Sequence, residues 1–330
     1  MLSARIKSIA SHLPSRQMTN DDLARLHPDW DMPKIESKIG IRSRSIASPA
    51  ETASDLAFEA CQKLFANPEC DRSSVDYLLF CTQSPDYFLP TSACILQHRL
   101  GLRKDLGAMD FNLGCSGYVY GLSIAKGLIE TGQASHVVLL TADTYSKFIQ
   151  ADDRSLVTLF GDGGTATWIE AVESESSLMG PFVFGTNGEG GPNLMVKHGG
   201  MRHPLSHPLS GPVPCPMHMD GPEILNFAIR VVPDCMQRLL DKAGVNQEEV
   251  DWFVFHQANL YLLEHLRKRL GIPPEKFLIH MADTGNTVSS TIPLVLEEAS
   301  RRHSFKKGDR ILLLGFGVGY SWAGTLLTWQ

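Results

Sequence analysis

The sequence predicts an α/β protein, and three observations support this. Short runs rich in β-branched and aromatic residues alternate with longer segments of helical spacing through the whole chain. With 330 residues, of which 43% are hydrophobic, the chain is longer than one hydrophobic core usually serves, so two packed halves are expected. A faint internal repeat agrees, because the apolar runs at 137–140 and 311–314 both precede a glycine-rich turn and a further strand.

The expected elements follow from hydrophobic periodicity. Apolar spacing predicts a helix over 54–65, where Leu56, Ala60 and Leu64 share one face, and further helices over 116–131, 222–243 and 259–270. Strands are expected at 75–80, 137–140, 166–169, 252–255 and 311–314. The stretch 185–222 is rich in Gly, Pro and His and is predicted to be a loop. It is longer than a simple connection between two elements needs to be, so a functional role is expected.

Charge and composition argue against several classes of function. The net charge of −6, from 30 basic and 36 acidic residues, gives no cationic field for binding nucleic acid. The apolar runs fall short of the roughly 18 residues that a membrane span needs, so no membrane contact is expected. The N-terminus lacks the basic and apolar regions of a secretory signal, and the cytoplasm is therefore the expected compartment.

Neither a disulfide framework nor a metal centre is expected. The chain has seven cysteines, an odd number without a CxxC pair, which predicts reduced thiols. His198, His203, His207 and His218 lie in the Gly/Pro-rich stretch without carboxylates at ligand spacing, so no metal is predicted there.

One cysteine stands where chemistry is expected. Cys115 follows the break at 112–114, and the predicted helix begins directly after it. Free amide N–H groups and the macrodipole at a helix N-terminus favour a thiolate over a thiol. A lone cysteine is more often buried and inert. However, His256 and Asn286 also lie where an apolar run or a glycine turn ends, and this combination is typical of thiol nucleophilic catalysis.

These three residues and their surroundings resemble the β-ketoacyl-acyl carrier protein synthase III family of the thiolase superfamily. Matching segments lie at 39–42, 160–164 and 315–322, so the resemblance covers nearly the whole chain. It implies a thiolase-like five-layer αβαβα fold made of two similar halves. Residues 1–175 would form the half with the nucleophilic Cys, and residues 176–330 the half with the His and Asn.

The resemblance also implies a decarboxylating condensation in fatty acid biosynthesis. Cys115 would carry an acyl group from acyl-CoA or acyl-carrier protein, to be joined to malonyl-acyl carrier protein. His256 and Asn286 would donate hydrogen bonds to the enolate, and the backbone N–H groups of Cys115 and Val318 would hold the oxyanion. Most relatives have Gly in place of Val318. No cofactor is implied, because coenzyme A enters only as part of a substrate.

Further contacts are implied for substrates and partners. The predicted substrate-binding residues are Phe316, Arg154, Met32, Trp30, Leu225, Gly221 and Leu89. Met32 stands where the family has an adenine-stacking tryptophan, and Trp30 lies two residues away. Acyl carrier protein is expected to dock on Arg267, Lys268 and Arg269. A homodimer is expected, in which the segment around Leu89 reaches the partner's acyl pocket.

One other hypothesis stays open, and two more are disfavoured. A related acyltransferase or condensing enzyme of specialised metabolism would use the same Cys, His and Asn. The altered adenine pocket favours it, as does the segment 112–114, where housekeeping enzymes usually carry small residues. A non-catalytic partner subunit is disfavoured because all three active residues are present. A degradative thiolase is disfavoured because the C-terminal glycine-rich turn lacks a second cysteine.

Overall fold

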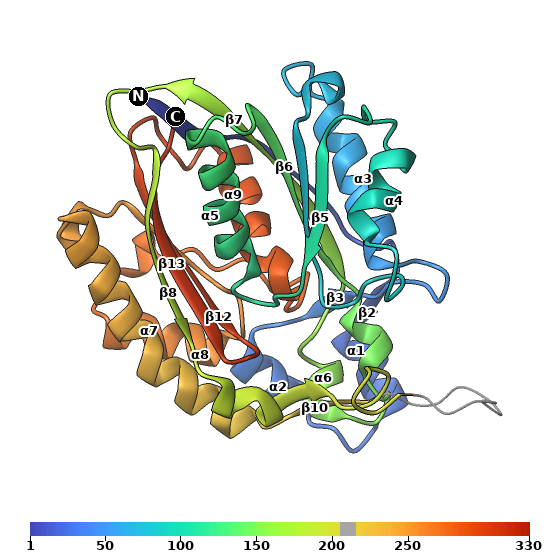
Figure 1. Ribbon diagram of the computed structural model, residues 1–330. Helices are drawn as coiled ribbons and strands as arrows, with labels where there is room; N and C mark the ends of the chain where they lie inside the picture. The colour runs from blue at the N-terminus through green and yellow to red at the C-terminus, as the bar shows by residue number, and fades with distance from the viewer. Residues whose placement is uncertain (205–215) are drawn as a thin grey trace.

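The computed structural model describes residues 1–204 and 216–330, which form layers in the order α, β, α, β, α (Figure 1). One sheet has the strand order β1-β7-β6-β4-β5, and the other has the order β11-β12-β13-β8. Both sheets mix parallel and antiparallel pairs. The α/β class and the layer order expected from the family resemblance are therefore confirmed.

The first sheet and its outer helices come from the N-terminal part of the chain. Its strands are β1 (Leu2–His12), β4 (Tyr77–Cys81), β5 (Gly107–Phe111), β6 (His136–Asp143) and β7 (Gly163–Glu173). The helices α3 (Ala53–Phe65) and α4 (Ser92–Arg99) cover its outer face. The apolar face of α3 predicted from Leu56, Ala60 and Leu64 is fully buried against this sheet.

The second sheet is formed by the C-terminal part of the chain. Its strands are β8 (Met179–Thr186), β11 (Trp252–Phe255), β12 (Arg310–Gly317) and β13 (Ser321–Thr328). On its outer side lie α7 (Gly221–Ala243) and α8 (Leu260–Arg269). The predicted division after residue 175 falls in the connection between β7 and β8.

Two helices fill the space between the sheets, α5 (Gly117–Glu130) and α9 (Thr291–Arg301) (Figure 1). Both bury apolar side chains, including Val119, Leu122 and Ile292. Close packing of α5 depends on Gly121, because a Cβ there would lie 2.6 Å from Leu139 of β6. The N-termini of α5 and α9 both lie next to the site described below.

The remaining elements surround one end of these layers. They are β2 (Gln17–Thr19), α1 (Asn20–Leu26), α2 (Met32–Ile39), β3 (Ser43–Ser45), α6 (Arg154–Val157), β9 (Leu194–Val196) and β10 (Met217–Met219). The loop predicted over 185–222 is partly wrong, because β9 and β10 pair antiparallel within it. Of the four histidines singled out there, His207 lies outside the described residues.

Two properties concern only residues 1–204 and 216–330. No helix in that part of the chain is long and apolar enough to cross a membrane. The same residues contain no group of three or more His, Cys, Asp or Glu side chains that could hold a metal ion.

Candidate active site

Cys115 lies in the turn between β5 and α5 and is only 7% exposed. Two glycines of β12 pack directly on this turn. A Cβ on Gly317 would lie 2.8 Å from the Cys115 sulfur, and a Cβ on Gly315 would lie 2.8 Å from the Cys115 carbonyl oxygen. Both positions therefore require glycine. The sulfur is held between the start of α5 and a strand of the other sheet.

His256 follows β11 directly and is 2% exposed. Its backbone N–H donates to the Leu314 carbonyl of β12 at 2.8 Å, and its Nδ1 lies 2.7 Å from the Thr291 hydroxyl. Burial lowers the pKa of His256 to about 3, so the imidazole is neutral at physiological pH. The Phe316 ring meets the imidazole edge to face, with centroids 5.7 Å apart. Because Nδ1 is engaged, Nε2 is the nitrogen left for a substrate.

The tautomer of His256 depends on which acceptor the Thr291 hydroxyl uses. The one hydrogen of that hydroxyl has two acceptors in reach, Nδ1 of His256 at 2.7 Å and the Val288 carbonyl oxygen at 3.1 Å. If the hydroxyl donates to Nδ1, then Nε2 carries the imidazole hydrogen and can donate to an enolate. If it donates to Val288, then Nδ1 carries the hydrogen and Nε2 becomes an acceptor. Thr291 was not identified from the sequence.

Asn286 lies in the turn before α9 and is 3% exposed. Its Oδ1 accepts the backbone N–H of Val288 at 2.9 Å, so its Nδ2 is the donor that remains. That nitrogen lies 3.5 Å from the Ala258 carbonyl oxygen, a long contact that leaves it available to a ligand. Val288 has a φ of 56°, which is strained for a β-branched residue. The strained turn fixes the direction of the Asn286 amide.

Burial dominates the chemistry of the Cys115 thiol. It raises the pKa of Cys115 to about 12, with a further rise from the nearby Asp143 carboxylate. The backbone N–H groups of Cys115 and Val318 oppose the rise, because both donate towards the sulfur. Burial therefore opposes the thiolate that the helix terminus favours, because desolvation destabilises a buried anion. The two opposing donors are the pair predicted for the oxyanion.

A cavity of about 90 Å³ brings the predicted catalytic side chains together. Its lining includes, among the predicted site residues, Cys115, His256, Asn286, Phe316, Gly221 and Leu225. A nucleophile, a neutral imidazole and an amide donor thus share one small space. This geometry suits acyl transfer followed by stabilisation of an enolate.

The predicted adenine contacts lie outside this cavity. Met32 begins α2, is 3% exposed and does not line this cavity. Trp30 already stacks on His27, with ring centroids 3.8 Å apart and planes 6° from parallel. Arg154 is exposed at the first residue of α6. Leu89 is 81% exposed and lines a separate cavity of about 900 Å³.

The three predicted docking charges on α8 differ in availability. Arg267 makes a 2.7 Å ion pair with Glu264 and donates to the Ile272 carbonyl, and its side chain is only 14% exposed. Lys268 is 71% exposed, and Arg269 is exposed as well. Arg267 thus holds the end of α8 in place. The exposed charges that face a partner are Lys268, whose Nζ lies 3.8 Å from a Glu264 carboxylate oxygen, and Arg269.

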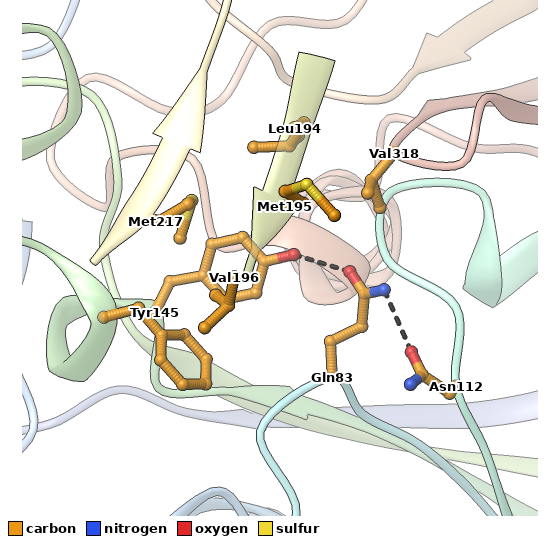
Figure 2. Close-up of a pocket in the computed structure, with 9 residues that line it drawn as sticks. Gln83, Asn112, Tyr145, Leu194, Met195, Val196, Met217 and Val318 are labelled. Carbon is orange, nitrogen blue, oxygen red and sulfur yellow. Dashed lines mark hydrogen bonds between the residues drawn. The ribbon is translucent and has the colours of Figure 1, made fainter. Parts of the chain in front are cut away.

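Figure 2 shows a further cavity of about 300 Å³, which shares Leu194 with the catalytic cavity and is also lined by Val318. Gln83, Asn112 and Tyr145 line it from positions just after β4, β5 and β6. They were not identified as a group from the sequence. The available signal was that β4 runs parallel to both β5 and β6, so polar residues after these strands meet at one edge.

Comparison with known proteins agrees with this geometry. Residues 109–188 match the family model described as 3-oxoacyl-[acyl-carrier-protein (ACP)] synthase III, and residues 240–329 match the model of its C-terminal part. The β-ketoacyl-[acyl-carrier-protein] synthase III of Caldanaerobacter subterraneus subsp. tengcongensis is 36% identical, over 100% of this chain and 98% of its own length.

Solved structures are also similar over the whole chain. A crystal structure of a 3-oxoacyl-(acyl-carrier-protein) synthase III has a TM-score of 0.96 and 52% identity, covering 99% of this chain and 100% of that one. The priming β-ketosynthase of the R1128 polyketide pathway has a TM-score of 0.88 and 30% identity, covering 99% of this chain and 96% of its own. The chain therefore belongs to the 3-oxoacyl-acyl carrier protein synthase III family, the condensing acyltransferases of thiolase fold.

Proposed function

We propose that this enzyme loads an acyl group on Cys115 and condenses it with malonyl-acyl carrier protein, as in fatty acid biosynthesis. The observation that carries these roles is the single cavity in which Cys115, His256 and Asn286 meet. In the first step the Cys115 sulfur attacks the thioester of the donor. A new C–S bond forms, the bond to the donor thiol breaks, and the proton of Cys115 leaves with that thiol.

The second step makes the carbon–carbon bond. Malonyl-acyl carrier protein loses carbon dioxide, and its enolate oxygen accepts hydrogen bonds from His256 Nε2 and Asn286 Nδ2. The enolate carbon then attacks the acyl carbonyl on Cys115. The tetrahedral oxyanion points at the backbone N–H groups of Cys115 and Val318, which already face the sulfur. Its collapse breaks the C–S bond, and the Cys115 thiolate takes up a proton, which the high pKa favours.

Donor and partners are part of the same proposal. Acyl-CoA or acyl-carrier protein is the donor, coenzyme A is a substrate rather than a cofactor, and acyl carrier protein docks on Lys268 and Arg269. A homodimer is supported by the exposed apolar segment of Tyr87, Phe88 and Leu89, at 62%, 75% and 81% exposure. The cytoplasm stays the predicted compartment.

The altered adenine region favours a donor other than a simple acyl-CoA. Met32 is buried and one face of the Trp30 ring is stacked on His27, so the aromatic surface open to adenine is reduced. We expect weak binding of free coenzyme A, and we expect Trp30→Ala to weaken it further if Trp30 serves adenine. Tight binding that Trp30→Ala leaves unchanged would contradict a role for Trp30.

A second candidate is a condensing enzyme of specialised metabolism with the same catalytic residues. One observation favours it, the polar wall that Gln83 and Asn112 give to the cavity beside Val318. It differs from the first candidate in the acyl group and acceptor, and not in the chemistry at Cys115.

Intact-mass analysis tests the proposal. Wild type is incubated with acyl-CoA and acyl-carrier protein donors, with and without malonyl-acyl carrier protein, beside Cys115→Ala and the matched exposed control Cys94→Ala. Wild type and Cys94→Ala should gain one acyl group and lose it when the malonyl substrate is added. His256→Ala and Asn286→Ala should keep the adduct without forming product. An adduct that persists in Cys115→Ala would overturn the assignment.

A further inference from the structure

The cavity of about 300 Å³ beside Val318 has one polar wall and one apolar wall (Figure 2). Gln83, Asn112 and Tyr145 form the polar wall. The apolar wall comes from β9 and β10 and consists of Leu194, Met195, Val196 and Met217. A pocket for a plain hydrocarbon chain would need only the second of these walls.

The polar wall has a fixed hydrogen-bond direction. The Tyr145 hydroxyl donates to Gln83 Oε1 at 2.5 Å, a length found for O–H···O bonds and too short for an N–H donor. The Gln83 Nε2 must then point at Asn112, and it donates to the Asn112 Oδ1 at 2.9 Å. Burial and the charges of Asp143 and Cys115 raise the pKa of Tyr145, which keeps its hydroxyl a donor. Both amide oxygens are therefore occupied as acceptors.

Some amide hydrogens on this polar wall have no hydrogen-bond acceptor in the described part of the chain. The second hydrogen of Gln83 Nε2 and both hydrogens of Asn112 Nδ2 have no acceptor among residues 1–204 and 216–330. Asn112 is exposed and Tyr145 is buried, so the wall runs from the mouth of the cavity inwards. A saturated chain would cover these donors without pairing them, which is unfavourable. A carbonyl oxygen is an acceptor only and would pair with them.

The polar wall lies close to the nucleophile. Gly114 immediately precedes Cys115, and a Cβ on Gly114 would lie 2.5 Å from Gln83 Oε1 and 2.8 Å from the Val318 side chain. Val318 also directs its backbone N–H at the Cys115 sulfur. The Gln83 side chain therefore packs against the residue before Cys115, and the cavity that it lines adjoins the catalytic cavity through Leu194.

Building on the proposed function, we propose that the acyl group loaded on Cys115 is a 3-oxoacyl chain. Its keto oxygen accepts hydrogen bonds from the amides of Gln83 and Asn112, and its tail lies along the apolar wall of β9 and β10. A 3-hydroxyacyl chain fits less well, because its own hydrogen needs a further acceptor on a wall of donors. Such a substrate is the product of a condensation or of the oxidation of a 3-hydroxyacyl thioester, so a reaction of one of these two classes must supply it.

The test compares three thioesters of equal chain length, octanoyl-, 3-hydroxyoctanoyl- and 3-oxooctanoyl-N-acetylcysteamine. The rate of Cys115 acylation is followed by intact mass for wild type, Gln83→Met and the exposed control Gln62→Met. Wild type and Gln62→Met should prefer the 3-oxo chain over octanoyl by about tenfold or more. Gln83→Met has nearly the same shape without the amide, and its preference should fall to about equal rates.

Specific outcomes overturn the inference. Equal or faster acylation of wild type by octanoyl would do so, as would a 3-oxo preference that Gln83→Met retains. If Gln83→Met does not fold, as judged by circular dichroism, Asn112→Ala provides the same comparison at an exposed position, and an unchanged preference there counts against the proposal. Absence of any adduct on Cys115 from all three thioesters, and from the acyl-CoA and acyl-carrier protein donors above, would instead refute the proposed function itself.

Discussion

Replacement of Thr291 by Val should separate the two halves of the reaction. The side chains have nearly the same shape, but Val cannot hydrogen-bond to His256 Nδ1, which lies 2.7 Å from the Thr291 hydroxyl. His256 is 2% exposed, so water does not replace the lost partner. Leaving one buried polar atom unpaired costs about 1–3 kcal/mol, which corresponds to about a 5- to 150-fold loss of rate if it is felt in the transition state.

The loss should appear in condensation and not in loading. Thr291→Val should form the Cys115 acyl adduct at nearly the wild-type rate, while its kcat with malonyl-acyl carrier protein falls within that range. Thr291→Ser keeps the hydroxyl and should restore most of the kcat. Stopped-flow acylation and steady-state condensation, each measured across pH, provide the two readouts. A wild-type kcat in Thr291→Val, or an equal defect in Thr291→Ser, would refute this reasoning about the tautomer.

Three further results are expected. Asp143→Asn removes the charge that helps raise the pKa of Cys115, so iodoacetamide should alkylate Cys115 about tenfold faster at pH 9; an unchanged rate would count against that electrostatic contact. The pKa of His256 is lowered to about 3 in the folded protein, so the unfolded chain binds the extra proton as the pH falls below 6.5, and stability should fall there by up to about 1.4 kcal/mol per pH unit. Urea unfolding at pH 7.5, 5.5 and 4.5 should show a shallower decline in His256→Gln, and parallel declines would contradict the assignment. Lys268→Glu combined with Arg269→Glu should raise KM for malonyl-acyl carrier protein about tenfold and leave the reaction with malonyl-CoA unchanged; equal effects on both substrates would argue against docking on α8.

Much of the fold follows from local patterns in the sequence. The helices predicted over 54–65, 116–131, 222–243 and 259–270 end within one residue of α3, α5, α7 and α8. Their apolar periodicity is strong, and residues such as Thr52 and Gly244 cap them as expected. Two strands at the edges of the first sheet, β1 and β5, were missed, and most of their residues are only partly buried.

Some residues of the site could also be predicted from local sequence patterns, and others could not. Cys115, His256 and Asn286 each stand in a recognisable local motif, so their positions could be predicted. Gln83 and Thr291 could not, because each acquires a partner only when separate elements pack together. The ionisation of Cys115 could not be predicted for a related reason: its pKa depends on how deeply the fold buries the sulfur, and the sequence pattern does not show that burial.

The packing of β12 on the cysteine turn has a consequence for how this enzyme could lose activity. A Cβ on Gly317 would clash with the Cys115 sulfur. The two backbone N–H donors that face the sulfur belong to Cys115, which follows a strand of the first sheet, and Val318, which follows a strand of the second. Any small sliding of one sheet over the other would therefore separate the nucleophile from its oxyanion donor before either sheet unfolds. We therefore expect catalytic activity to fall on warming at a lower temperature than the one at which circular dichroism shows loss of secondary structure.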